Sequence, residues 1–224
     1  MTALCFLTGC TVTEQMTIGR TGGSIDSDID IESYFIEVLE DLAEFMPESN
    51  ESVMDSAIST FSRQLAESGH AGDVVFVKDG ENNYVGSFSF DSFSALVSAM
   101  NENREQSVIK ETANSLEFHV DIDNYTELEQ IVPFLADPNI EVYLAKYNIG
   151  YSEEEYLEML VFSLGEEAPE SVMNSNITLN IAVPGSITAL EGAQKLSDSS
   201  FSYTFRLIDF LLLQRPLSFR VEWK

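Results

Sequence analysis

Two rows of acidic side chains are the stretches of this 224-residue chain whose spacing could bind a metal ion. The first row stands at positions 1, 3, 5 and 12 of the calcium-loop pattern and consists of Asp26, Asp28, Asp30 and Glu37. A calcium loop needs glycine at its sixth position for a sharp turn, and Ile31 occupies that position here. Because residues 24–31 also alternate between apolar and polar types, we interpret the row as the solvated face of a strand.

The second row contains a histidine and consists of Glu117, His119, Asp121 and Asp123. Side chains two residues apart on a strand share a face, so this row could touch a metal ion. Zinc requires three or four convergent ligands, usually with histidine or cysteine prominent. The chain has only one other histidine, His70, in a glycine-flanked segment. We therefore predict a second solvated face, with no metal site and no cofactor.

Motifs of the common enzyme classes are missing from the sequence. It has no Gly-x-Ser-x-Gly elbow, phosphate-binding loop, dinucleotide fingerprint or His-Glu-x-x-His pair. A glycosidase uses two carboxylates, but such a pair can always be chosen from 38 acidic residues. We therefore predict no catalytic residue and no enzymatic activity, with a secreted hydrolase as the least favoured alternative.

Cys10 is one of two cysteines and closes the stretch Leu7-Thr8-Gly9-Cys10 at the end of a short apolar run. The small residues before this cysteine resemble the lipobox of bacterial lipoproteins. The resemblance implies that residues 1–9 are a signal remnant, that Cys10 carries the lipid, and that the protein is anchored in the cell envelope outside the cytoplasm. The stretch departs from an ordinary signal because Met1 to Gly9 contain no basic residue. The alternative is an ordinary first strand with a buried cysteine.

The net charge of −27 limits the partners of the chain. A field of that sign repels nucleic acid, which we exclude as a partner. Apolar runs after Cys10 are far shorter than the ~20 residues of a membrane-spanning helix. Membrane contact is therefore expected through the N-terminal lipid.

The remaining chain is predicted to form a flexible tether and one domain. Residues 10–21 lack a clear core pattern and are followed by Gly22 and Gly23, so we expect a tether. Residues 22–224 are expected to form a single α+β extracytoplasmic domain. Its sheet is predicted to be mostly antiparallel, with helices packed on one face and β-hairpins at the end.

A recurring unit underlies this fold prediction: a strand of period 2, a polar cap, an aromatic residue and a helix of period 3.6. Its copies begin near Ser24, Tyr84, Leu116 and, more loosely, Tyr147. Ser152 with Glu155, and Asn124 with Glu127, have the spacing of a helix capping box. Between these copies we predict a helix over 51–68, a hairpin turning at Asp79–Gly80, a linker over 101–112 and a strand over 140–145.

The last third resembles the C-terminal part of LppM-like bacterial lipoprotein domains. A strand ending in Pro184–Gly185, a turn at Glu191–Gly192 and an aromatic-rich strand carry this resemblance. The family usually has Asn-Gly at that turn and tryptophan in the next strand, unlike this chain. The resemblance implies an α+β extracytoplasmic domain with an apolar cavity and a lipid-binding role.

Four consecutive apolar residues, Phe210, Leu211, Leu212 and Leu213, precede a connection at Gln214–Pro216 that we expect to close a terminal hairpin. As the end of a strand they would either be buried or form the wall of an apolar pocket. We therefore expect a lipid-anchored protein that binds an apolar or amphipathic small molecule. The alternative is a lipoprotein that acts by protein–protein contact through its acidic surface.

Overall fold

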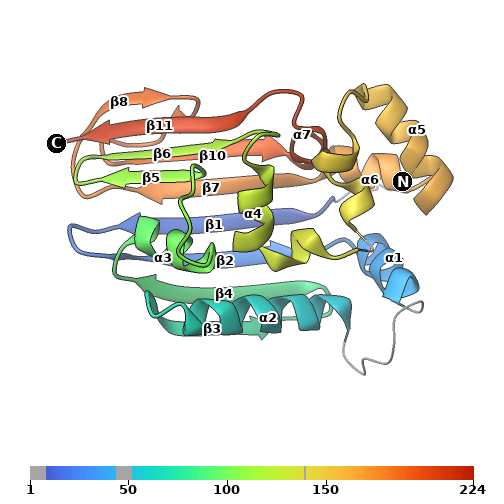
Figure 1. Cartoon of the computed structure of the whole chain (residues 1–224), viewed down its shortest axis with the longest axis horizontal. Coiled ribbons are helices and arrows are strands. Elements are labelled where there is room, and N and C mark those ends of the chain that lie inside the picture. Colours follow the sequence, from blue (N-terminus) through green and yellow to red (C-terminus); the bar gives the residue numbers. More distant parts are fainter. Residues whose placement is uncertain (1–8, 44–51, 139) are drawn as a thin grey trace, which may run out of the picture.

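The computed structural model describes residues 9–43, 52–138 and 140–224. A large sheet forms one layer, and a smaller sheet together with helices forms the other. The strands form one sheet with the order β3-β4-β2-β1-β7-β10-β9 and a second with the order β5-β6-β11-β8 (Figure 1). Every pairing is antiparallel except that of β1 with β7. The predicted α+β class with a mostly antiparallel sheet is confirmed.

The seven-stranded sheet has the N-terminal strand near its centre. Its members are β1 (Thr11–Ile18), β2 (Gly23–Asp30), β3 (Ala71–Lys78), β4 (Asn83–Phe90), β7 (Asn176–Ala182), β9 (Gln194–Lys195) and β10 (Ser200–Arg206). The smaller sheet contains β5 (Ile109–Thr112), β6 (Ser115–Val120), β8 (Ile187–Glu191) and β11 (Leu217–Trp223). The buried side chains of both sheets belong to one continuous apolar core.

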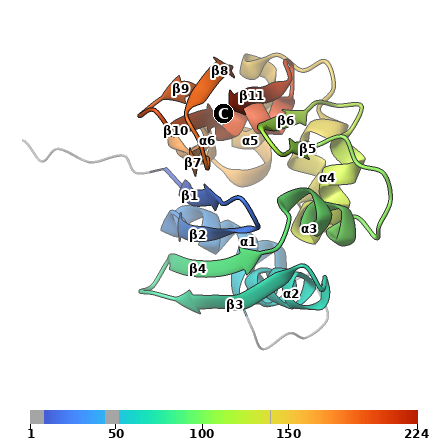
Figure 2. The ribbon, with the colours of Figure 1, turned by 90° about the vertical axis from the view of Figure 1, so that its left-hand side faces the viewer.

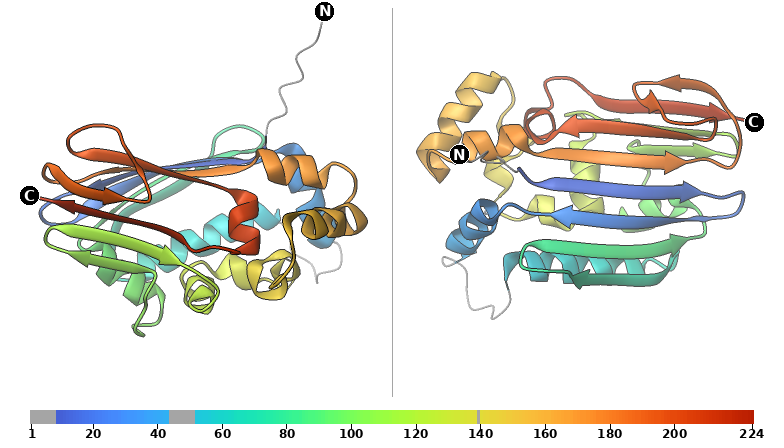
Figure 3. Two further views of the ribbon diagram at one scale, coloured as in Figure 1. Left: turned by 90° about the horizontal axis from the view of Figure 1, so that it is seen from above. Right: turned by 180° about the vertical axis from the view of Figure 1, so that it is seen from behind.

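The helices lie on one side of the large sheet and at one end of it. They are α1 (Ser33–Ala43), α2 (Val53–Glu67), α3 (Phe93–Met100), α4 (Tyr125–Ile131), α5 (Glu153–Leu164), α6 (Ala168–Asn174) and α7 (Leu207–Leu212). Figure 2 shows α2, α3 and α4 on the same side of the large sheet as the small sheet. No helix of the described part covers the opposite face of the large sheet, which is turned toward the viewer in the right-hand view of Figure 3.

The alternation of side chains explains why one face of the large sheet is covered and the other is wet. In β1, Met16 and Ile18 are buried while Gln15 and Thr17 are exposed. In β2 the three aspartates of the first acidic row, Asp26, Asp28 and Asp30, are all exposed. An antiparallel sheet with one face on the core shows this pattern, and the row is therefore a strand face, as expected.

The predicted strand-to-helix junctions are confirmed at three places, where β2 leads to α1, β4 leads to α3 and β6 leads to α4. The predicted helix over 51–68 is α2, and the hairpin at Asp79–Gly80 joins β3 to β4. The capping box at α5 is also confirmed, because the Ser152 hydroxyl accepts from the Glu155 amide and the Glu155 carboxylate accepts from the Ser152 amide.

The prediction of a tether over residues 10–21 is wrong. Thr11–Ile18 form β1, which is hydrogen-bonded on one side to β2 and on the other to β7. The polar side chains on the outer face of β1 make the whole segment look like a polar loop in the sequence, although Met16 and Ile18 lie on its inward face. The parallel partner β7 lies more than 150 residues later in the chain, so no local sequence pattern predicts the pairing of β1 with β7.

The predicted terminal hairpin is also wrong. β10 pairs with β7 and β9 in the large sheet, whereas β11 pairs with β6 and β8 in the small one. The apolar run that we assigned to a strand end lies in α7 and its C-terminal cap, where Leu213 takes a left-handed conformation with φ of 42°. A short apolar run fits a buried helix as well as a strand, and here the helix carries the chain from one sheet to the other.

Three smaller predictions also fail. The segment 101–112 is not a linker throughout, because it ends in β5. Residues 140–151 contain the short 3₁₀ turns Glu141–Tyr143 and Ala145–Tyr147 in place of strands, and the Tyr156 hydroxyl donates to the Tyr143 carbonyl at 2.8 Å. Asn124 precedes α4, but its side chain makes no capping hydrogen bond. The side-chain amide Nδ2 donates to the His119 carbonyl and the Ser107 hydroxyl instead.

Candidate functional site

A cavity of about 230 Å³ lies between the large sheet and the elements that cover it. Four strands of the large sheet form one wall through Glu14, Met16, Ile25, Ser27, Phe88, Leu179 and Ile181. The other wall comes from α2, α3, the end of α4 and the small sheet, through Phe61, Leu65, Phe93, Leu96, Val97, Met100, Ile109, Leu116, Phe118, Ile131, Val132 and Phe219. Seventeen of these nineteen lining residues are apolar, and the two exceptions are Glu14 and Ser27.

Aromatic rings stiffen the walls of the cavity. Phe118 stacks on Phe219 with ring centroids 5.6 Å apart. Phe76 of β3 does not line the cavity but contacts two rings that do, with centroid distances of 6.5 Å to Phe88 and 5.9 Å to Phe61. A Cβ atom at Gly86 would come within 2.2 Å of the Phe76 ring. Glycine at that position therefore lets the ring lie flat across β4 and hold two cavity-lining rings in place. Such rigid aromatic contacts favour a preformed cavity.

Glu14 is the one titratable side chain among the lining residues that the structure describes. It occupies the inward row of β1 and stands directly opposite Ser27 of β2 and Leu179 of β7. The Ser27 hydroxyl, itself buried, donates a hydrogen bond of 2.6 Å to Glu14 Oε2. The result is a small polar spot on an otherwise apolar wall.

Burial controls the protonation of Glu14. Removal of the carboxylate from water disfavours its charged form and raises its pKa from 4.5 to about 7. The Ser27 hydrogen bond works in the opposite direction, and the negative charge of Asp26 adds to the rise. Glu14 can therefore change charge near neutral pH.

The sequence analysis did not identify Glu14 because it assigned that segment to a tether. A signal was nevertheless present: Val12, Glu14, Met16 and Ile18 alternate with threonine and glutamine. Such a row marks a half-buried strand with one carboxylate on its apolar face. Ser27 lies on the inward face of the next strand, between the outward-facing Asp26 and Asp28.

Cys10 lies immediately before β1 and is held by three hydrogen bonds. Its amide donates to Ser175 Oγ at 2.8 Å, its carbonyl accepts from the Asn176 amide at 3.0 Å, and its Sγ accepts from the Glu32 amide at 3.3 Å. The residue is half-buried, and burial raises the pKa of its thiol to about 11. The unmodified thiol is therefore a poor nucleophile at neutral pH.

Gly9 is tightly packed against α6 and the residue that follows it. A Cβ atom there would lie 2.4 Å from the carbonyl carbon of Asn174. Gly9 thus has a structural reason to be small in addition to its place in the Leu7–Cys10 stretch. Leu7 and Thr8 lie outside the described residues.

The four apolar residues Phe210, Leu211, Leu212 and Leu213 lie away from the cavity wall and are not among its lining residues. The Phe210 ring contacts Tyr125 of α4 with centroids 6.1 Å apart, and the three leucines are buried. Leu212 also borders a cleft of about 480 Å³, which Arg206 and its ion-pair partners Glu153 and Asp209 share. A ligand-binding role for these four residues stays a prediction.

The side chains of the second acidic row have different partners. The His119 ring pairs with Asp121 at 2.9 Å, and Glu117 stands across from Lys110 and Arg220. His70 pairs separately with Asp91 at 3.0 Å. Among the described residues, no group of three or more histidine, cysteine, aspartate or glutamate side chains is placed to hold a metal ion.

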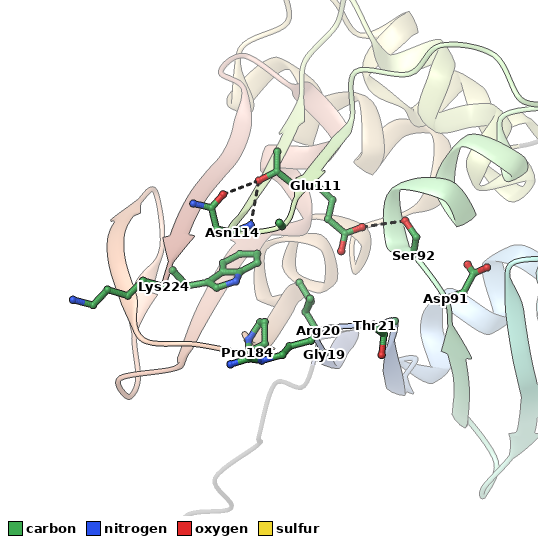
Figure 4. A pocket seen from close by; sticks show the side chains of 14 residues that line it. Gly19, Arg20, Thr21, Asp91, Ser92, Glu111, Asn114, Pro184 and Lys224 are labelled. Atoms are coloured by element: carbon green, nitrogen blue, oxygen red, sulfur yellow. Dashed lines mark hydrogen bonds between the residues drawn. The ribbon is translucent and has the colours of Figure 1, made fainter.

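A larger open cleft of about 620 Å³ lies at the far end of the large sheet, where the turn after β1 meets the turn after β5. Figure 4 shows Arg20 and Lys224 on one side of it and Asp91 on the other, with Glu111 pointing toward Ser92. Glu111 Oε2 accepts from the Ser94 amide at 3.0 Å at the start of α3. Because this carboxylate is engaged in capping and the remaining charges are of mixed sign, the cavity beneath the large sheet is the better candidate.

Comparisons with known proteins leave the family of the chain open. No protein-family model matches the sequence, and no curated protein matches it. The solved structures include one match, the NMR structure of the folded domain of LppM from Mycobacterium tuberculosis. It is 11% identical, covers 100% of this chain and 96% of that chain, and has a TM-score of 0.37. LppM also represents the lipoprotein family that the last third of the sequence resembles, but a likeness at this TM-score carries no functional argument.

Across the described residues, the structure contains no helix of the length and apolar character needed to cross a membrane. The two longest stretches of helix are α2 and α5, with 15 and 12 residues. Both carry several charged residues.

Proposed function

We propose that this chain is a lipid-anchored protein of the cell envelope whose domain binds a small apolar or amphipathic molecule in the cavity beneath the large sheet. The observation that carries the proposal is the cavity of about 230 Å³ with seventeen apolar lining residues. An engineered apolar cavity of ~150 Å³ in another protein stays dry and binds benzene. A cavity of the present size accommodates one small molecule, and apolar burial supplies the binding energy at roughly 25 cal/mol per Å².

The contacts of Cys10 are compatible with acylation. An N-acylated cysteine retains its N–H and carbonyl, and a thioether sulfur retains a lone pair for the Glu32 amide. Since β1 begins at the next residue, a lipid on Cys10 would hold the domain directly against the membrane, without the tether that the sequence predicted. The lipid attachment itself rests on the resemblance of Leu7–Cys10 to a lipobox.

A second candidate is protein–protein contact through the acidic surface. The uncovered face of the large sheet favours it, because Asp26, Asp28 and Asp30 are exposed there in one row. A partner with a matching basic surface would gain association rate from this field. Neither candidate includes a chemical reaction.

Calorimetry with toluene, a neutral apolar probe, tests the binding proposal. The full chain should bind toluene at one site and melt at a higher temperature in its presence, since a ligand of the native state stabilises it. Leu179→Trp, which lines the cavity beside Glu14, should abolish binding by filling the space. Leu212→Trp is the matched control outside the cavity and should leave toluene binding intact.

The outcomes separate the candidates. If the parent protein gives no heat with toluene and no shift in melting temperature, the ligand-binding proposal is wrong. Protein–protein contact through the acidic surface is then the favoured function. Binding that Leu212→Trp abolishes and Leu179→Trp does not would move the site to α7, as the sequence analysis expected.

A further inference from the structure

We infer that the cavity is built for an apolar molecule that carries a positively charged amine, and that Glu14 and Ser27 receive this amine. The inference rests on the proposed function and deepens it by naming the chemical class of the ligand. It depends on the placement of one carboxyl group on an apolar wall.

The position of Glu14 is unfavourable unless it serves a ligand. The inward row of β1 otherwise holds Val12, Met16 and Ile18, and a leucine or methionine would suit position 14 for packing. Burial of a carboxylate among apolar groups is costly unless it is paired and hydrogen-bonded. Ser27 is its one hydrogen-bond partner among the described residues, so the carboxylate keeps capacity for further donors.

An ammonium group complements this spot better than the alternatives. It supplies three N–H donors and one positive charge, and the carboxylate and the Ser27 oxygen can both accept from it. A hydroxyl supplies a single donor. A carboxylate would place a second negative charge beside Glu14, and two like charges at that distance repel strongly in a medium of low polarity.

The size of the cavity restricts the amine to a small molecule. About 230 Å³ holds one short alkyl chain or one aromatic ring, by comparison with the ~150 Å³ cavity that accepts benzene. A lipid with two acyl chains and an amine headgroup would not fit inside. The amine is therefore expected to be a free single-chain or aromatic compound.

Glu14 also makes amine binding depend on pH. Its pKa of about 7 means that it must release a proton before it pairs with an ammonium group. The lining residues from β2, β4, β7, the helices and the small sheet are apolar except Ser27, and Asp26, on the outer face of β2, is the neighbouring charge that acts on Glu14. Affinity for an amine should therefore rise about tenfold between pH 6 and pH 8, because the ionised fraction of Glu14 rises by that factor.

Calorimetric titration of the full chain with octylamine, octanol and octanoate tests the inference, because these compounds share one tail and differ in the head group. At pH 8 octylamine should bind at least tenfold more tightly than octanol, and octanoate should bind most weakly. Glu14→Gln keeps an acceptor for Ser27 and should remove both the preference for the amine and its pH dependence, while octanol affinity stays within about twofold.

Failure of the inference is distinguishable from failure of the proposed function. Equal affinities for the three compounds, or an amine preference that survives in Glu14→Gln, would overturn the inference while cavity binding stands. If toluene and all three compounds give no heat, the cavity binds nothing and both proposals fall. Ser27→Ala is a second variant that keeps the charge, and it should weaken octylamine binding with little effect on octanol.

Discussion

Replacement of Glu14 by glutamine should make the protein more stable, and the gain should grow with pH. In the unfolded chain this carboxyl has a pKa of 4.5, whereas in the folded protein burial raises it to about 7. A raised carboxyl pKa favours the folded state at low pH, and this contribution is lost as the pH rises toward the folded value, because the unfolded chain ionises first.

The size of the effect follows from these two pKa values. With 1.36 kcal/mol per pKa unit, the easier ionisation of Glu14 in the unfolded chain should lower the free energy of unfolding by about 0.8 kcal/mol at pH 5 and about 3.3 kcal/mol at pH 8, relative to a side chain that cannot ionise. Glutamine cannot ionise, so the difference in unfolding free energy between Glu14→Gln and the parent should rise by about 2.5 kcal/mol over this range.

Urea unfolding of the two proteins at pH 5, 6, 7 and 8 measures this difference directly. Global charge repulsion is nearly the same in both proteins and cancels in the comparison. Glu158→Gln, at an exposed position of α5, removes one charge at a surface site and should show a difference that stays within about 0.5 kcal/mol at every pH. If Glu14→Gln shows an equally flat difference, Glu14 is not held in an apolar wall and the reasoning about the cavity fails.

Three further predictions follow from the packing and one from the resemblance of Leu7–Cys10 to a lipobox. Leu212→Trp should overpack the buried contacts of α7 and cost about 1–3 kcal/mol in urea unfolding, and an unchanged stability would show unfilled space there. Gly86→Ala should cost a similar ~1–3 kcal/mol, because its Cβ would overlap the Phe76 ring; a neutral result would mean that the ring moves freely. Deletion of Gln214–Lys224 removes β11 from between β6 and β8 and should leave a chain without a cooperative melting transition. Cys10→Ser should release the protein from the membrane fraction of its host, and a variant that stays membrane-bound and processed before residue 10 would refute the lipid anchor.

The strand-to-helix junctions were predictable because their signals are local. β4 shows period-2 alternation and α3 shows helical spacing, with Ser92 as the N-cap between them. Ser152 and Glu155 likewise form their capping box from residues three apart. Asn124 and Glu127 have the same spacing, but the Asn124 side chain bonds to His119 and Ser107 instead, so a local pattern is sufficient only where no tertiary partner competes.

The centre of the large sheet was not predictable in the same way. The alternating row Val12, Glu14, Met16 and Ile18 is visible in β1 itself, but the row does not predict that β2 pairs on one side and β7 on the other. β7 comes from the distant end of the chain, so their parallel pairing depends on the whole fold. We predicted a tether at this place because residues 10–21 are largely polar and Gly22 and Gly23 follow them.

The candidate site was missed for a related reason. Its lining residues come from elements spread between β1 and β11, and no motif of close spacing unites them. The run Phe210–Leu213 attracted attention because it is contiguous and apolar. It proved to be helical, since an apolar run of this length fits a buried helix and a strand equally well.

A crystal structure of the full chain soaked with octylamine at pH 8 tests the central claim most directly. The alkyl chain should lie in the cavity between the large sheet and α3, with the amine nitrogen about 2.7–3.2 Å from a Glu14 carboxylate oxygen. Density for the amine only on the outer surface, or a cavity closed by the Phe88 and Phe219 side chains, would contradict the account.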